Sequence, residues 1–208
     1  MNKHTWLVKL CLGFVKLTGV VPAWLFLKPK VRLAPGAKRK LPKSCILVSN
    51  HMKLMDFVLY LVVFPFRTIR FLIAEVLYQK SAVMARFLDL IGGIRVDRDT
   101  KAFGFVSYAL EVLDHGGTVG VFPQGRLPVK GCQFPFTVST AFIALHSDAP
   151  IVPVYTDGNY GLFKRAHVVI GAPIKLAELC KEGLSEQEQL AHLTKALEET
   201  VFGLKELK

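Results

Sequence analysis

The chain has 208 residues, of which 51% are hydrophobic and 21% are charged, and its formal net charge is +11. This length suits one domain with or without a short appendage, and the apolar share excludes a disordered or collagen-like chain. The four cysteines have no short pair spacing, which argues against a zinc site or a disulfide framework. We therefore expect no bound metal and a core stabilised by burial of apolar side chains.

The excess positive charge lies in the N-terminal quarter of the chain. Eleven of the 27 Lys and Arg residues precede Asp56, which is the first acidic residue. The 152 residues after Asp56 carry 16 basic and 15 acidic side chains and are nearly neutral. A charge excess confined to one end predicts an anionic surface as its partner, whereas a nucleic-acid-binding domain would be basic across its folded body. We therefore expect no nucleic-acid partner.

Residues 6–27 form an apolar stretch with a tryptophan near each end, Trp6 and Trp24. On a helix of about 100° per residue, one narrow stripe holds the polar positions Asn2, Thr5, Lys9, Gly13 and Lys16. Such a helix lies in the plane of a bilayer interface, with its lysines reaching the headgroups and its tryptophans at interfacial depth. We expect Pro22 to break or bend this helix near its end.

Three other interpretations of residues 6–27 stay open. A single transmembrane helix would be long enough, although two lysines near its middle are costly in hydrocarbon. A cleaved signal peptide is disfavoured by those lysines and by the lack of a small-x-small cleavage site. The third is a helix packed on a soluble domain. We favour peripheral, monotopic attachment at the cytoplasmic face of the cell membrane, with the basic residues of 28–43 against anionic lipid.

From Lys43 onward, short apolar runs alternate with helical patterns. The runs predict buried strands at residues 45–49, 69–74, 118–122, 151–155 and 167–170. The helical patterns cover residues 56–64, 81–90, 101–115, 137–146 and 185–204, the last with a capping box of Ser185 and Glu188. This alternation predicts an α/β fold with a largely parallel central sheet flanked by helices. We expect residues 1–43 to form a basic amphipathic membrane segment and residues 44–208 to form the globular domain.

The residues after the first predicted strand are candidates for catalysis. A polar turn presents His51, and Asp56 opens the apolar helix that follows. An Asp at this position can simply stabilise the start of the helix. It can also bond one ring nitrogen of His51, which fixes the tautomer and leaves the other nitrogen available as a general base. On an ideal helix the two side chains would lie about 140° apart, so the pairing requires a non-helical turn.

Three further blocks place a Gly or Pro turn beside the end of a predicted strand. They are residues 92–98 with Arg95 and Arg98, residues 121–126 with Gly125 and Arg126, and residues 149–154. Each arginine alone is typical of a surface residue beside a tight turn. Several guanidinium groups at strand ends of one α/β sheet would suit bidentate binding of a phosphate.

In their order and spacing, the four blocks resemble those of the glycerolipid acyltransferase family typified by 1-acyl-glycerol-3-phosphate acyltransferase. That family carries NHxxxxD, a Gly-x-x-x-x-x-Arg segment, FPEGTR and an apolar block around IVPV. The resemblance covers residues 49–154 and implies that residues 44–208 form an acyltransferase domain. It implies that His51 is the base, that Asp56 orients it, and that Arg98 binds the phosphate of the acceptor.

The resemblance also implies roles for the other matched residues. Those of the acceptor-binding site are Arg95, Gln124, Gly125 and Arg126, and those that help shape the acyl site are Asn50, Pro150 and Pro153. Gln124 stands where the family has Glu, and Arg126 stands where it usually has Thr. Replacing Glu by Gln removes a charge but keeps the size and the hydrogen-bonding capacity of the side chain. This departure leaves the identity of the acceptor open.

The implied activity is transfer of a fatty acyl group from an acyl thioester, either acyl-CoA or acyl-carrier protein, to a hydroxyl of a lysolipid. The expected acceptor is 1-acyl-glycerol-3-phosphate, in phospholipid biosynthesis, and the reaction needs no cofactor. Two alternatives stay open. One is an enzyme for another acceptor, such as a lyso-aminolipid or glycerol 3-phosphate, and the other is a catalytically silent membrane-binding relative.

Overall fold

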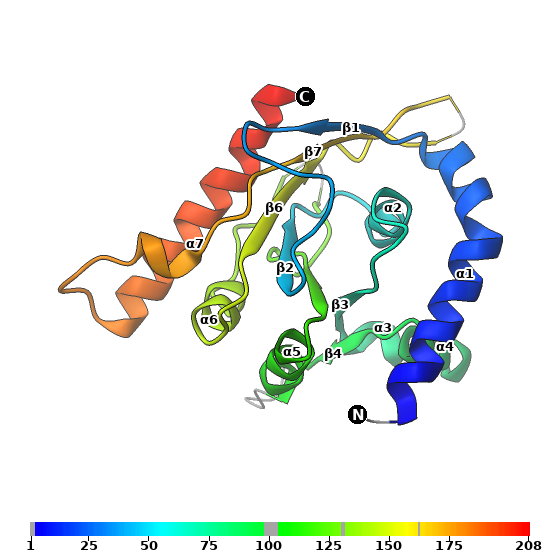
Figure 1. Ribbon diagram of the computed structural model, residues 1–208, viewed down its shortest axis with the longest axis horizontal. Coiled ribbons are helices and arrows are strands. Elements are labelled where there is room, and N and C mark those ends of the chain that lie inside the picture. Colours follow the sequence, from blue (N-terminus) through cyan, green and yellow to red (C-terminus); the bar gives the residue numbers. More distant parts are fainter. Residues whose placement is uncertain (1–2, 98–103, 130–131, 162) are drawn as a thin grey trace.

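The computed structural model describes residues 3–97, 104–129, 132–161 and 163–208 (Figure 1). These residues form a central sheet with the strand order β1-β7-β6-β2-β5-β3-β4. Its strands are β1 (Lys30–Leu33), β2 (Cys45–Ser49), β3 (Ile69–Ala74), β4 (Ile94–Val96), β5 (Thr118–Val121), β6 (Ile151–Thr156) and β7 (His167–Ile170). Within this sheet β6 and β7 pair antiparallel, and the other neighbours pair in parallel. The predicted α/β fold with a mostly parallel sheet is therefore confirmed.

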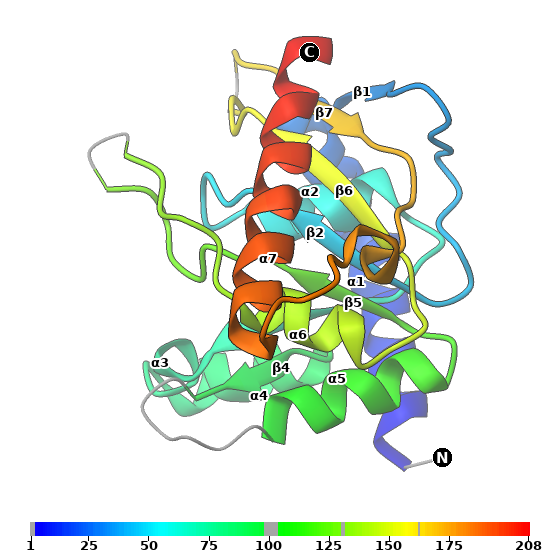
Figure 2. The same ribbon diagram turned by 90° about the vertical axis from the view of Figure 1, so that its left-hand side faces the viewer.

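Helices cover both faces of this sheet, as Figures 1 and 2 show. They are α1 (Lys3–Leu27), α2 (Asp56–Val63), α3 (Glu75–Tyr78), α4 (Ala82–Leu90), α5 (Gly104–Asp114), α6 (Ser139–Leu145) and α7 (Glu186–Gly203), with short 3-10 helices at Leu176–Leu179 and Leu204–Leu207. Helices α1 and α2 pack on one face, and α5, α6 and α7 pack on the other. Helices α3 and α4 lie beside β3 and β4, where α4 also contacts α1.

Every residue of β2 is buried, because helices cover both faces of the sheet at this strand. Successive side chains of a strand point to opposite faces. Cys45 and Leu47 therefore pack under α1 and α2, while Ile46 and Val48 pack under α5, α6 and α7. Full burial of an aliphatic side chain such as Ile46, Leu47 or Val48 stabilises the folded state by about 1.5–3 kcal/mol relative to leaving it exposed. The sheet is thus stabilised from both faces, and the loops after β2 and β5 carry the residues described below.

One expectation about the N-terminal region needs correction, namely that Pro22 could break the first helix. Pro22 lies inside α1 and does not break it, because a proline removes one backbone hydrogen bond without having to end the helix. The helix continues to Leu27, and the backbone N–H of Lys28 still donates to Trp24. Residues 28–43 contain β1, which pairs with β7 at the edge of the sheet.

Two further short elements were missed by the prediction from sequence. Strand β4 and helix α3 were not predicted, because three or four residues are too few to show a period. The capping box of α7 is confirmed, with Ser185 and Glu188 making both of its hydrogen bonds. Across the described ranges, no helix combines the length and the apolar character that crossing a bilayer requires.

Candidate active site

His51 follows β2, Asp56 begins α2, and the turn between them brings their side chains together. Nδ1–H of His51 donates to Oδ2 of Asp56 at 2.9 Å. The backbone N–H groups of Met52 and Lys53 donate to the same oxygen at 2.7 and 2.8 Å. A carboxylate oxygen only accepts, so Nδ1 carries the proton and Nε2 presents a lone pair. The predicted pair is therefore formed, on the non-helical turn that it requires.

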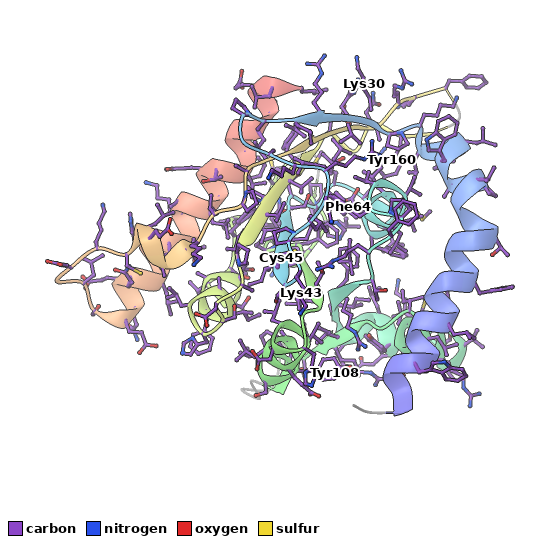
Figure 3. The ribbon with its side chains drawn as sticks, in the orientation of Figure 1. Lys30, Lys43, Cys45, Phe64, Tyr108 and Tyr160 are labelled. Carbon is purple, nitrogen blue, oxygen red and sulfur yellow. The ribbon has the colours of Figure 1, made fainter. Side chains whose placement is uncertain are left out.

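Asp56 is fully buried, so its second oxygen also needs a donor. The hydroxyl of Tyr160 donates to Oδ1 of Asp56 at 2.9 Å. Burial, together with the charge of Asp56, raises the pKa of the Tyr160 phenol, which keeps it protonated as a donor. Tyr160 lies in the loop between β6 and β7, outside the four blocks, and no sequence signal pointed to it. Figure 3 shows Tyr160 beside α2, the helix that Asp56 begins.

The imidazole of His51 is held by an aromatic stack as well as by Asp56. Its ring lies on Phe122, with 4.3 Å between the centroids and 17° between the planes. Phe122 in turn stacks on Phe71 of β3 at 5.5 Å. The His51 side chain is 16% exposed, which leaves it access to the cavity described below. The first and third blocks therefore meet at the imidazole of His51.

Gln124 is buried beside the backbone of His51. The N–H of His51 donates to Oε1 of Gln124 at 2.6 Å, and Nε2 of Gln124 donates to Oε1 of Gln133. A glutamate at this position could also accept from His51, but it could not donate to Gln133. The next residue, Gly125, has a φ of +64°, which lets the third block turn sharply away from β5. Gln133 was another residue that the sequence did not single out.

A cavity of about 630 Å³ opens beside His51. Most of its wall is apolar and comes from α2, β3, α3 and α4, including Phe57, Leu77 and Phe87. Its polar lining includes Gln124 and Gly125, together with Lys80, Arg126, Thr137 and Ser139. A largely apolar cavity with a few polar groups beside a histidine is the arrangement expected of a site for a lipid-like ligand.

The cationic side chains of the second and third blocks do not all reach this cavity. Arg126 lines it, with its guanidinium over the ring of Phe134 at 4.7 Å. Lys80, which lies between α3 and α4 and belongs to no block, also lines it. Arg98, to which the resemblance assigns the phosphate, lies outside the described residues.

Arg95 is engaged by its own neighbours. Its guanidinium pairs with Asp89 at 2.8 Å and approaches Glu75 at 3.8 Å. It also lies over the ring of Tyr78 at 4.2 Å. Within the described residues Arg95 is not part of the cavity wall, so the structure does not bring it together with Arg126.

The three residues expected to shape the acyl site lie within strands of the sheet or directly beside them, Pro153 in β6, Asn50 after β2 and Pro150 before β6. The amide of Asn50 bonds both the N–H and the C=O of Thr156 at 2.8 Å, which joins the ends of β2 and β6. Pro153 lies opposite Val48, and the carbonyl of Pro150 accepts from a backbone N–H of β2. Among the described residues, none of the three lines the cavity: the Asn50 amide is bonded to Thr156, and the two prolines belong to the β6 side of β2, away from β5 and β3.

Within the described ranges, no group of three or more His, Cys, Asp and Glu side chains is arranged to hold a metal ion.

Several known proteins resemble this chain. The family model described as Acyltransferase matches residues 35–157. The 1-acyl-sn-glycerol-3-phosphate acyltransferase alpha of Homo sapiens is 30% identical over 110 residues, which are 52% of this chain and 39% of that protein. The beta form of Homo sapiens is 25% identical over 113 residues, 54% of this chain and 41% of that protein. The chain therefore matches about two fifths of the length of these curated relatives.

A solved structure extends the similarity to the whole fold. The crystal structure of PlsC, the 1-acyl-sn-glycerophosphate (LPA) acyltransferase of Thermotoga maritima, matches with a TM-score of 0.67 and 25% sequence identity. The match covers 100% of this chain and 83% of that one.

Proposed function

Since the chain belongs to the acyltransferase family, we propose that it transfers a fatty acyl group from an acyl thioester to a hydroxyl of 1-acyl-glycerol-3-phosphate. The observation that carries this proposal is the His51–Asp56 pair at the edge of a largely apolar cavity. The names of the relatives support the choice of acceptor, since each names an acyltransferase that acts on this lysolipid. Acyl-CoA and acyl-carrier protein are both suitable donors.

The proposed reaction uses His51 as a general base. Nε2 of His51 takes the proton of the acceptor hydroxyl while the hydroxyl oxygen attacks the thioester carbon. The C–S bond then breaks, the ester forms, and the imidazolium returns the proton to the leaving thiolate. Asp56 holds the imidazole in the required tautomer and stabilises the positive charge that it gains. No covalent acyl-enzyme is needed.

The cavity wall suits the two substrates. The apolar side chains of α2, α3 and α4 would shelter an acyl chain from water. Arg126 and Lys80 would bind the phosphate of the acceptor, since charge-assisted hydrogen bonds to phosphate are strong. The role of Arg98 as a phosphate ligand is proposed from its match to the second block alone.

We further propose that residues 1–43 attach the acyltransferase domain, residues 44–208, to the cytoplasmic face of the membrane. Trp6, Phe14 and Trp24 of α1 are each more than half exposed, and basic residues follow the helix directly. An exposed apolar helix face beside a basic segment suits the interface of an anionic bilayer. Because β1 also belongs to the sheet, this attachment would hold the cavity at a fixed distance from the lipid.

The proposal is tested with purified full-length protein and labelled acyl groups. Acyl-CoA and acyl-carrier protein are each offered with 1-acyl-glycerol-3-phosphate, glycerol 3-phosphate and a lyso-aminolipid. We expect the highest kcat/KM with 1-acyl-glycerol-3-phosphate. If the protein prefers another acceptor, that acceptor replaces 1-acyl-glycerol-3-phosphate as the proposed substrate. If no combination gives transfer, the protein is better interpreted as a catalytically silent relative.

A further inference from the structure

Four donors among the described residues meet the carboxylate of Asp56. Three belong to the catalytic turn, namely the His51 ring and the backbone N–H groups of Met52 and Lys53, and all three use Oδ2. The fourth is the hydroxyl of Tyr160, which comes from the loop between β6 and β7 and uses Oδ1. We propose that Tyr160 is a positioning residue, whose hydroxyl fixes Asp56 so that Oδ2 faces His51. This inference rests on the acyl transfer proposed above.

Burial makes this hydrogen bond difficult to replace. Asp56 is fully buried and Tyr160 is 6% exposed, so water has little access to Oδ1. When a buried acceptor loses its donor, nothing offsets the free energy that was spent on removing that acceptor from water. An exposed acceptor would form a hydrogen bond with water instead. Tyr160 therefore acts on the orientation and the charge of Asp56, and through Asp56 on His51.

The loop that carries Tyr160 is anchored close to the catalytic turn. Gly158 has a φ of +60°, and a Cβ there would lie 2.5 Å from Cβ of Met52. Before it, Asp157 accepts from the backbone N–H and from Nδ1–H of His167, at 3.0 and 2.9 Å. At the other end of the loop, Ala166 donates to the backbone of Leu27 at the end of α1. These contacts hold the phenol in place before any substrate binds, as positioning requires.

The hydrogen bond from Tyr160 changes, in a predictable direction, the negative charge that Asp56 presents to His51. A hydrogen bond donated to Oδ1 stabilises the carboxylate and disperses its negative charge. Without this bond, Asp56 would present more negative charge to His51 and would stabilise the imidazolium further. The neighbouring charged and titratable groups are Lys53 over the ring of Tyr160, Tyr60 on α2, and Lys80, Asp97 and Arg126 in the cavity wall. None of these groups is altered in the test below.

The test compares full-length wild-type protein with Tyr160→Phe. We expect kcat to fall roughly tenfold with KM little changed, the scale of one hydrogen bond to a charged group. We also expect the acid limb of the kcat/KM–pH profile, and the midpoint of the His51 titration followed by NMR, to move to higher pH. Tyr155→Phe is the matched control, because Tyr155 is a buried tyrosine on β6 that takes no part in the site.

A second variant keeps the shape of the side chain if Tyr160→Phe is poorly folded. Placing 3-fluorotyrosine at position 160 makes the phenol a stronger donor, so the His51 titration midpoint should move to lower pH. Unchanged kcat and titration in folded Tyr160→Phe, or an unchanged midpoint with 3-fluorotyrosine, would overturn the inference. Wild-type protein without transfer activity would overturn the proposed function instead, while the NMR titration would still decide the role of Tyr160.

Discussion

At the scale of single residues, the candidate site depends on side chains that orient one imidazole. Asp56 fixes its tautomer, Phe122 supports one face of the ring, and Gln124 holds the backbone N–H of the same residue. These three contacts come from the first residue of α2 and from the loop after β5. A change at any of them should therefore affect the direction in which Nε2 of His51 points.

Gln124→Glu tests the position at which the chain departs from the family pattern. Glu keeps the acceptor for the His51 N–H, and the amide of Gln133 can turn to donate to it, so we expect Tm to stay within a few degrees. The added negative charge beside the cavity should disfavour an anionic acceptor, because like charges repel strongly in a partly dry site. We therefore expect kcat/KM for 1-acyl-glycerol-3-phosphate to fall several-fold relative to a lysolipid without net charge.

The control for that prediction is Gln124→Met, which keeps the size of the side chain and removes both of its hydrogen bonds. It should lower kcat for all acceptors alike. If Gln124→Glu instead raises activity manyfold on every lysolipid, Gln124 is a defect of the site, and the silent relative becomes the better interpretation.

At the scale of elements, α1 carries the proposed attachment and also belongs to the fold. It packs against α2 and α4, and its last residue, Leu27, is fully buried in the core. Its outer face keeps Trp6, Phe14 and Trp24 exposed. Deletion of the helix would therefore confuse loss of membrane binding with loss of folding, whereas substitutions on the outer face separate the two.

The double variant Phe14→Ser/Trp24→Ser should bind anionic vesicles roughly tenfold more weakly, because two apolar side chains no longer enter the interface. High salt should weaken the binding of the intact chain as well. Leu179→Ser, an exposed leucine on the far side of the sheet, is the control and should bind as the wild type does. Vesicle sedimentation gives the measurement, and membrane integration that resists carbonate would contradict attachment in the plane of the interface.

The capping box of α7 gives a prediction about stability alone. The Ser185 hydroxyl accepts from the backbone N–H of Glu188, which satisfies a donor that the helix leaves unpaired. Ser185→Ala should lower Tm by roughly 2–4 °C, as loss of a helix cap does in a chain of this size. Because α7 contributes no residue to the described cavity wall, kcat should be unchanged. A fall in kcat at full folding would show that α7 influences the site.

At the scale of the whole molecule, the sequence predicts the features whose residues all lie in one short segment of the chain. β2 and β6 were predicted because both of their faces are covered and nearly all of their residues are apolar. β1 was not predicted, because its four residues include Lys30 and Arg32 and lie at the edge of the sheet. His51 and Asp56 were predicted because one short turn contains them both.

Other parts of the site depend on the topology. Tyr160 is 104 residues from Asp56 along the chain, and the order of the strands brings it there. Lys80 and Gln133 likewise reach the site from segments without a recognisable pattern. Conversely, Pro150 and Pro153 match a block of the family but lie in β6 and before it, away from the cavity. A sequence block therefore identifies the fold more safely than it identifies a contact with substrate.

The central claim is that His51 is the base of an acyl transfer. Its most direct test is the rate at which purified wild-type and His51→Ala proteins transfer a labelled acyl group to 1-acyl-glycerol-3-phosphate, at equal concentrations of folded protein. Loss of a general base typically costs about 10²–10⁴-fold, so we predict a fall of that size in kcat, with the melting curve of the variant close to that of the wild type. Substantial transfer by folded His51→Ala protein would contradict the mechanism.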